Sequence, residues 1–175
     1  MPDTFRPSTW SLRSTLVRWQ ASWFSQPMKG FPDLPPIWLL GTMALSWGLA
    51  RLLPAPSPGA VGLWLGAGII VAGLALIAWS GLWFLRKRTP IEPHHAPKAL
   101  IVEGPYRVSR NPIYLALVAI ALGYALRQEN ILALLPVPVL LVILDRRFAS
   151  AEESGLRAAF GAQAETYLRT TRRWL

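Results

Sequence analysis

A long apolar run without a charged residue constrains the fold of this chain more than any other feature. The run extends from about Ala60 to Leu85 and ends at the basic cluster Arg86-Lys87-Arg88. A helix of that length reaches across the hydrocarbon core of a bilayer, which is roughly 30 Å thick. In hydrocarbon every backbone polar group must be satisfied internally, and a helix satisfies its own. The run therefore predicts a membrane-spanning helix with a basic stop at the interface.

Three further apolar runs extend this pattern to a polytopic all-α bundle with about four transmembrane helices. The first, from about Pro36 to Leu53, is joined to the long run by Pro54-Ala-Pro-Ser-Pro-Gly59, which marks a tight hairpin connection. The later two, Ile113 to Leu126 and Ile131 to Leu144, are short. They are expected either as two spans extended by flanking residues or as a hairpin that does not fully cross.

Glycines and prolines inside the runs predict local packing. Gly66, Gly68 and Gly73 are available for close helix contacts, as small residues are in membrane bundles. Pro136 and Pro138 are expected to distort the fourth run, because proline removes a backbone donor.

The chain is expected to be a single domain, residues 1–175, with two polar ends. Residues 1–30 predict an interfacial amphipathic helix with apolar residues at helical spacing, and the alternative is a disordered basic tail. Residues 36–85 are expected to form the helical hairpin, and residues 86–175 make up the rest of the domain. From Asp145 onward the pattern is polar and helical, which predicts a cytosolic helix pair that folds back under the bundle.

The placement of charge orients the bundle. The formal net charge of +9 is compatible with nucleic acid binding, but the basic residues cluster at the ends of apolar runs, as expected beside anionic headgroups. Sixteen lysines and arginines fall on one side, and only Arg51 and Arg127 lie near the other two loops. The positive-inside rule then predicts an integral protein of a bacterial inner membrane with both termini in the cytoplasm. Membrane lipids are expected partners and nucleic acid is not.

The segment between the second and third runs contains residues that an ordinary loop does not need. Gly104 permits a tight turn, Pro105 fixes the next φ, and Pro112 favours an extended residue followed by the first turn of a helix. Polar groups are thereby placed at a helix N-terminus, where the dipole favours anions. A basic membrane anchor with tyrosines at the interface would explain the arginines, but it would not explain the Gly-Pro and Asn-Pro pairs.

Two motifs in this order resemble the superfamily of isoprenylcysteine carboxyl methyltransferases and phospholipid methyltransferases. The first is Leu-Ile-Val-x-Gly-Pro-Tyr-Arg-x-Ser-Arg-Asn-Pro-x-Tyr, ending at Tyr114. The second begins at Glu152-Glu153, continues to Phe160-Gly161 and is followed by a closing Arg173-Trp174. The resemblance covers roughly the C-terminal half, and it implies an integral membrane enzyme that uses S-adenosyl-L-methionine.

The resemblance also implies that residues 86–175 are the cofactor-binding catalytic half, and it implies which residues form the site. The cofactor pocket would be built from Lys98, Ala99, Leu100, Ile101, Tyr106, Asn111, Pro112, Ile113, Tyr114 and Glu152. Catalysis would involve Tyr106, Arg110, Asn111, Tyr114 and Arg147, the last as an approximate stand-in for a substrate-binding arginine whose position is Phe148 here. Lys98 and Asn111 stand where the isoprenylcysteine enzymes often carry histidine. The two acids could instead form an ion pair with Arg146 and Arg147, and no metal site is expected.

The implied reaction is methyl transfer to a lipid-soluble or lipid-attached acceptor, either an isoprenylcysteine-like carboxylate or a phospholipid amine. One alternative is an NADPH-dependent membrane reductase, because sterol and steroid reductases resemble this architecture and its Asn-Pro-x-Tyr element. Another is a non-catalytic membrane subunit whose basic face binds anionic lipids. The sequence leaves the acceptor and the oligomeric state open.

Overall fold

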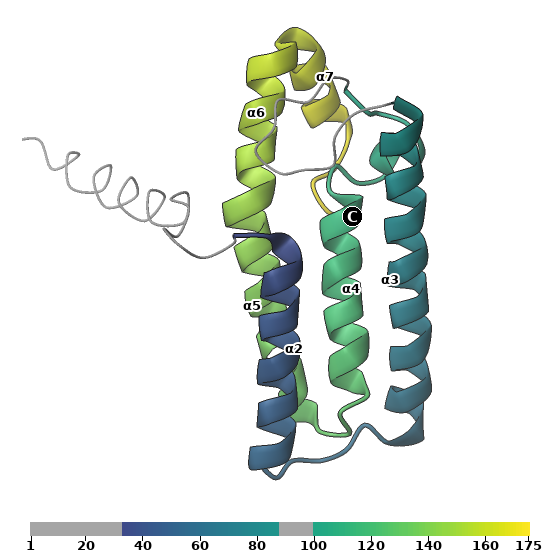
Figure 1. Ribbon diagram of the computed structural model, residues 1–175, viewed down its shortest axis with the longest axis vertical. Coiled ribbons are helices and arrows are strands. Elements are labelled where there is room, and N and C mark those ends of the chain that lie inside the picture. Colours follow the sequence, from purple (N-terminus) through teal and green to yellow (C-terminus); the bar gives the residue numbers. More distant parts are fainter. Residues whose placement is uncertain (1–32, 88–99) are drawn as a thin grey trace, which may run out of the picture.

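The computed structural model describes residues 33–87 and 100–175, and every regular element within them is a helix (Figure 1). The α-helices are α2 (Pro35–Leu52), α3 (Gly59–Lys87), α4 (Pro112–Leu126), α5 (Pro136–Ile143), α6 (Ser150–Phe160) and α7 (Ala162–Thr170). Short 3₁₀ segments η1 (Gly104–Arg107) and η2 (Ile131–Leu134) precede α4 and α5, and a π-helical segment, η3 (Leu144–Ala149), separates α5 from α6. The expected all-α class is therefore confirmed for this part of the chain.

The hairpin of α2 and α3 forms as the apolar runs predict. Prolines occupy the first positions of α2, where a backbone N–H would have no partner within the helix, so proline costs no hydrogen bond there. At the other end of α2, the Asn130 side chain donates to the carbonyls of Ala50 and Leu53 at 3.3 and 2.8 Å. The backbone N–H of Ile131 donates to the Pro56 carbonyl at 3.0 Å. These bonds tie the α2–α3 connection to the α4–η2 connection.

Small residues let α3 pack closely against α4. A Cβ atom on Gly66 would lie 2.5 Å from the carbonyl oxygen of Gly123, and one on Gly73 would lie 2.8 Å from Ile120. The predicted close packing is confirmed for Gly66 and Gly73. It is wrong for Gly68, where an added Cβ would meet nothing within 4 Å. Helical period explains the difference, because Gly68 lies two residues from Gly66 and so faces away from α4.

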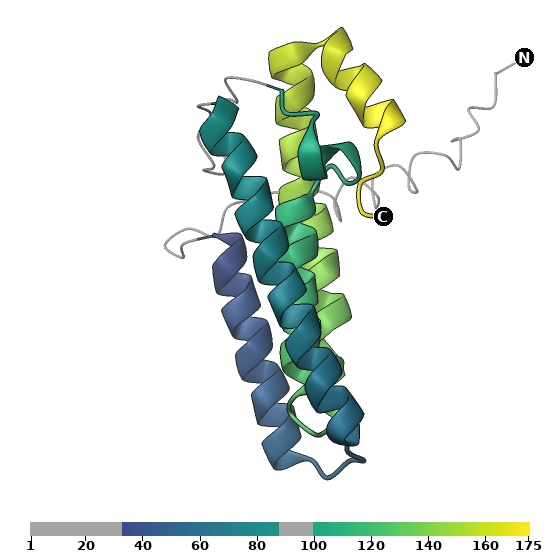
Figure 2. The same ribbon diagram turned by 90° about the vertical axis from the view of Figure 1, so that its right-hand side faces the viewer.

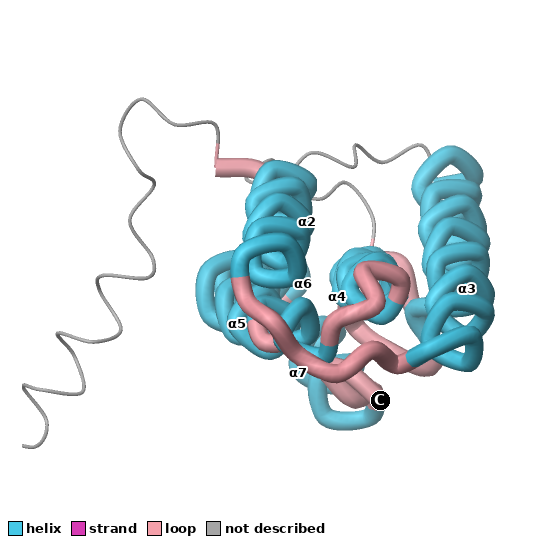
Figure 3. Tube along the Cα trace, turned by 90° about the horizontal axis from the view of Figure 1, so that it is seen from below, coloured by secondary structure: helices cyan, strands magenta, loops and turns pink. Residues whose placement is uncertain are grey.

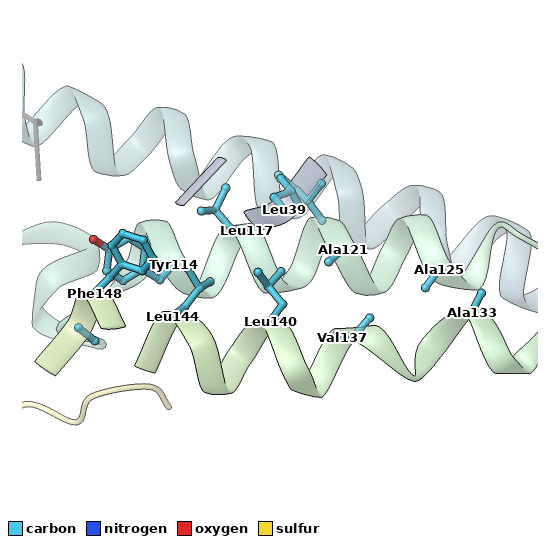
Figure 4. Packing of buried hydrophobic residues seen from close by; sticks show 12 residues of the cluster. Leu39, Tyr114, Leu117, Ala121, Ala125, Ala133, Val137, Leu140, Leu144 and Phe148 are labelled. Carbon is cyan, nitrogen blue, oxygen red and sulfur yellow. The ribbon is translucent and has the colours of Figure 1, made fainter. Parts of the chain in front are cut away.

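The opposite side of α4 packs against α2 and α5, so that α4 lies between α3 and this pair (Figure 3). Figure 4 shows Ala121 of α4 on the side of that helix toward Val137 and Leu140 of α5, and Leu117 of α4 beside Leu39 of α2. This apolar cluster fixes α4 on its second side. The N-terminus of α4 is therefore held in place relative to every other long helix.

The chain does not turn at Asp145, where the polar region was expected to begin as separate helices. Leu144, Ile143 and Ala149 all have right-handed helical backbone, and α5, η3 and α6 follow one another as one continuous rod. Pro136 is the first residue of α5 and is separated from η2 by Leu135, so the expected distortion of this run takes the form of a change from 3₁₀-helix to α-helix. The expected helix pair does exist as α6 and α7, which are joined at Gly161 with a φ of 51°, and α7 turns back from α6 (Figure 2).

Only part of the four-span prediction is supported within residues 33–87 and 100–175. One helix there, α3, is long and apolar enough to cross a membrane, and α4 is a shorter apolar helix. Seventeen per cent of the most apolar window of α3 is buried inside the protein. Its outer side chains are therefore exposed, as expected of a helix that faces lipid. The expected N-terminal amphipathic helix falls outside the described residues.

The structure makes a testable distinction between Gly66 and Gly68 on the same helix. Gly66→Ala should destabilise the protein by about 1 to 3 kcal/mol, because the added methyl overpacks the α3–α4 contact. Gly68→Ala should be neutral or slightly stabilising, since alanine is the better helix former by about 1 kcal/mol and has open space there. Thermal unfolding in detergent measures both changes, and equal effects at the two positions would contradict this packing.

Candidate functional site

The turn before α4 is built around Gly104. Its φ is 60°, a conformation that side chains disfavour, and a Cβ atom there would lie 1.9 Å from Nε1 of Trp83. Gly104 thus allows η1 to rest on the indole of α3, as its expected turn role requires. On the preceding residue, Glu103 forms an ion pair with Lys87 at 2.7 Å, and this bond holds the pKa of that carboxyl below its usual range.

Tyr106 of η1 lies at the junction between this turn and the bundle. Its ring meets Phe84 of α3 edge-on at 5.7 Å, and its backbone carbonyl accepts a hydrogen bond from Tyr167 Oη at 2.8 Å. The residue is 7% exposed, yet its hydroxyl makes no hydrogen bond of acceptable geometry. Burial and the charge of Glu152 raise the pKa of Tyr106, and the neighbouring Ser80 acts in the opposite direction. A buried hydroxyl without a partner costs about 1 to 3 kcal/mol, so Tyr106 is suited to a ligand that completes its bonding.

Tyr114 and Glu152 meet across the site. The Tyr114 hydroxyl, on the first turn of α4, donates to Oε1 of Glu152 on α6. The Tyr114 ring packs 6.1 Å from that of Phe148, which is 2% exposed (Figure 4). The Phe148 position, where related enzymes were expected to carry a substrate-binding arginine, therefore serves the core in this chain.

Glu152 occupies an unusual electrostatic position. The residue as a whole is exposed to solvent, whereas its carboxyl group is surrounded by protein on most sides. The resulting desolvation raises its pKa to about 7, against an opposing effect of the Tyr114 hydrogen bond. An acid with this pKa changes charge near neutral pH and can hold or release a proton at its carboxylate oxygens. Such shifted acids are more common at functional sites than elsewhere.

Glu153, the other acid of the pair, has a different environment. It is 5% exposed, and Arg173 donates to both of its oxygens at 2.7 and 2.6 Å. Arg110 adds an ion pair at 3.1 Å. The partners of Glu153 in the structure are therefore Arg110 and Arg173, whereas the alternative offered by the sequence was an ion pair with Arg146 and Arg147. Arg110, which was expected among the catalytic residues, forms an ion pair with Glu153 of α6.

The segment that leads into α4 is attached to the C-terminal tail. Arg110 N–H donates to the Arg172 carbonyl at 2.9 Å, and the Asn111 side chain donates to the Arg173 carbonyl at 3.2 Å. Asn111 precedes Pro112, the first residue of α4, and Ile113 follows it. Asn111 and Pro112 are buried and Ile113 is half-buried. The structure thus gives the Asn111 amide a bond to the backbone of the tail.

The remaining expected residues fall in three places. Leu100 is half-buried and Ile101 buried, directly before η1. Lys98 and Ala99 lie outside the described residues. Arg147 of η3 donates from Nε to both oxygens of Asp33 at 2.8 and 2.7 Å, and its guanidinium lies 6.0 Å from the Trp38 ring. Arg147 therefore binds a carboxylate of the chain itself.

Sequence reasoning missed Ser80 and the bonding of the tail. Ser80 is fully buried, and it follows Gly66 and Gly73 at seven-residue spacing on the face of α3 that meets α4. That spacing was a readable signal. Arg173 was noticed only as part of a motif, and its partners Glu153 and Asp145 are distant in sequence, so no local pattern could pair them.

The comparisons with known proteins bear on this arrangement. The family model for phospholipid methyltransferases matches residues 61–163, which is more than half of the chain. The chain belongs to the phospholipid methyltransferase family. The match spans α3, the Gly104 turn, the Tyr114–Glu152 contact and all of α6. Neither the curated proteins nor the solved structures contain a significant match.

Membership of the phospholipid methyltransferase family implies a membrane-associated methyltransferase and sets the chemistry that the site must serve. Within residues 33–87 and 100–175, no three His, Cys, Asp or Glu side chains are grouped to hold a metal ion. The groups that do converge are one titrating carboxylate and two phenols. They are suited to binding and orienting a cation or a polar nucleoside.

The raised pKa of Glu152 predicts a pH-dependent cost to stability. Because its folded-state pKa of about 7 exceeds the unfolded value near 4.5, its contribution is complete below pH 4.5 and is lost as pH rises through 7. Glu152→Gln should therefore gain thermal stability relative to the parent protein between pH 5 and 8, without added ligand. Melting temperatures across that range measure the difference. A constant difference would mean that Glu152 titrates as an ordinary surface acid.

Proposed function

We propose that this chain is an S-adenosyl-L-methionine-dependent methyltransferase that acts on the amine of a phospholipid at the membrane surface. The observation that carries the proposal is the Tyr114–Glu152 contact beside the unpartnered hydroxyl of Tyr106. This cluster lies where the apolar bundle meets its polar helices. Family membership supports methyl transfer, and the two finer points, cofactor and acceptor, rest on the residues of the site.

The cofactor fits the polar groups that the cluster offers. S-adenosyl-L-methionine carries a cationic sulfonium, an ammonium and ribose hydroxyls, and it supplies a methyl group that is already electrophilic. Ionised Glu152 would bind the ammonium or the ribose, and the Tyr106 hydroxyl would gain the hydrogen bond that it lacks. The ring of Tyr106 can also face a cation at a gain of about 0.5 to 2 kcal/mol.

The charges around the cluster favour an amine acceptor over a carboxylate. A carboxylate acceptor needs a cation to bind it, and three arginines on the described elements nearby are each paired with an acid. Arg110 and Arg173 bind Glu153, and Arg147 binds Asp33. What the site presents is a carboxylate and neutral phenols. An ammonium headgroup is attracted to this arrangement.

An amine must lose a proton before or as it gains a methyl group, since only its neutral form has a lone pair. Where Glu152 binds the ribose hydroxyls and not the ammonium of the cofactor, its carboxylate, with a pKa of about 7, can accept that proton at neutral pH. The Tyr114 hydroxyl holds the carboxylate in place through its hydrogen bond. Much of the remaining rate enhancement comes from orientation in a site that excludes water.

The membrane arrangement belongs to the same proposal. We infer that α2, α4 and the α5–η3 rod cross the bilayer alongside α3, with both termini and the site in the cytoplasm. A soluble cofactor then enters from the cytoplasm and the lipid from the bilayer. Among the aromatic residues near the C-terminal end of α3, Trp83 packs on Gly104 and Phe84 on Tyr106, while Trp79 is 48% exposed. This leaves Trp79 as the candidate that faces lipid.

Cofactor binding should depend on pH through Glu152. Because only the ionised acid binds the ligand well, the affinity for S-adenosylhomocysteine should be about tenfold weaker at pH 6 than at pH 8. Glu152→Gln should bind weakly and equally at both values, and it controls for titration of the ligand itself. Calorimetry in detergent measures both. Protection by NADPH with no response to S-adenosylhomocysteine would replace the proposal with a reductase.

The acceptor can be identified by following the methyl group. Protein in vesicles with methyl-labelled cofactor should label phosphatidylethanolamine in a base-stable form, and vesicles of phosphatidylglycerol, which has no amine, should give no product. Tyr106→Phe should lower turnover at least tenfold, the effect of losing a bond of about 1.4 kcal/mol or more. Label that enters a prenylated cysteine as a base-labile ester, with none in the amine lipid, would contradict the proposed acceptor.

A further inference from the structure

Arg173, near the C-terminus, makes an unusual number of bonds for a residue in a tail. Its Nε and Nη2 donate to the two oxygens of Glu153 at 2.7 and 2.6 Å, a parallel pair that fixes the carboxylate in orientation as well as distance. Its Nη1 donates to both oxygens of Asp145 at 3.2 and 3.3 Å. Trp174 adds a bond from Nε1 to Asp145 at 2.9 Å. Two points on the α5–α6 rod are thereby held.

The backbone carbonyl of Arg173 binds the segment that leads into α4. The Arg173 carbonyl accepts from Ser109 Oγ at 3.1 Å and from the Asn111 side chain at 3.2 Å. Asn111 is the residue directly before α4, which begins at Pro112. Arg173 therefore joins the start of α4 to η3 and α6. Tyr114 lies on the first turn of α4 and Glu152 on the first turn of α6, so the residue connects both partners of their contact.

Because α6 is a helix, fixing the direction of one side chain also fixes the direction of its neighbour in sequence. Adjacent residues on an α-helix point about 100° apart around the axis. When Glu153 is bound by Arg173, the rotation of α6 is set and Glu152 is turned to the position where Tyr114 donates to it. We propose that Arg173 is a positioning residue, which fixes the rotation of α6 and thereby keeps Glu152 against Tyr114. Its effect on methyl transfer rests on the proposed function, but its effect on Glu152 does not.

A positioning role and a purely electrostatic role of Arg173 predict opposite changes in the pKa of Glu152 when Arg173 is replaced. The titratable groups that face Glu152 from packed elements are Tyr114 on α4 and Tyr106 on η1, with Glu153 next to it on α6 and bound to Arg110 and Arg173. If Arg173 acted only as a nearby cation, its removal would raise the pKa of Glu152. If it positions Glu152, its removal frees the carboxylate into water, and the pKa falls from about 7 toward 4.5.

The test measures the protonation of Glu152 directly, in protein without cofactor. The carboxyl C=O stretch in the infrared, taken as the difference between each protein and its Glu152→Gln counterpart, is followed against pH. Arg173→Gln and Arg173→Lys are compared with Arg172→Gln, which removes the same charge from an exposed neighbour. Arg173→Lys retains the charge and loses the paired geometry, so it separates the two effects even if Arg173→Gln folds poorly. A cooperative melting transition confirms that each variant is folded.

We expect the Glu152 titration to move down by at least one pH unit in both Arg173 variants and to stay in place in Arg172→Gln. S-adenosylhomocysteine affinity, measured on the same proteins, should then lose its dependence on pH between 6 and 8. A titration that rises in Arg173→Gln and stays unchanged in Arg173→Lys would overturn the proposal. Absence of cofactor binding in the parent protein, with the titration shift intact, would contradict the proposed function alone.

Discussion

The hydrogen bond between Tyr114 and Glu152 depends on two separate sets of contacts in the fold. One is the close packing of α4 against α3, which places Tyr114 through the contact of Gly66 with Gly123. The other is the attachment of α6 by the ion pairs of Glu153, which places Glu152. The proposed positioning role predicts that the two side chains separate if either is loosened. The helical bundle and the polar tail therefore both contribute to the candidate site.

The site is not arranged for stability. A carboxylate whose pKa is raised to about 7 and a buried hydroxyl without a partner both cost free energy in the protein alone. Glu153, one residue away, is by contrast fully paired. The difference between adjacent acids on one helix is the physical signature of a division of roles. Glu153 is bound on both oxygens, and in the proposed function Glu152 is left to bind the cofactor and exchange a proton.

Much of the fold was predictable from the sequence because it follows from local chemistry. Apolar length predicts α3, proline placement predicts where α2 and α4 begin, and glycine predicts the turn at Gly104. Of the residues expected in the site, Tyr114 and Glu152 do meet, and their role in binding stays a prediction. The partners of Arg173 were not predictable, because ion pairs between distant segments have no local pattern. The continuity of the rod through η3 was missed because a polar residue at Asp145 resembles a helix end.

The central claim is that the Tyr106, Tyr114 and Glu152 cluster binds the methyl donor. A structure determined with S-adenosylhomocysteine tests this most directly. We predict ligand atoms within hydrogen-bond distance, about 2.6 to 3.2 Å, of both the Glu152 carboxylate and the Tyr106 hydroxyl. A ligand bound elsewhere, with the Tyr106 hydroxyl still lacking a partner, would contradict the account.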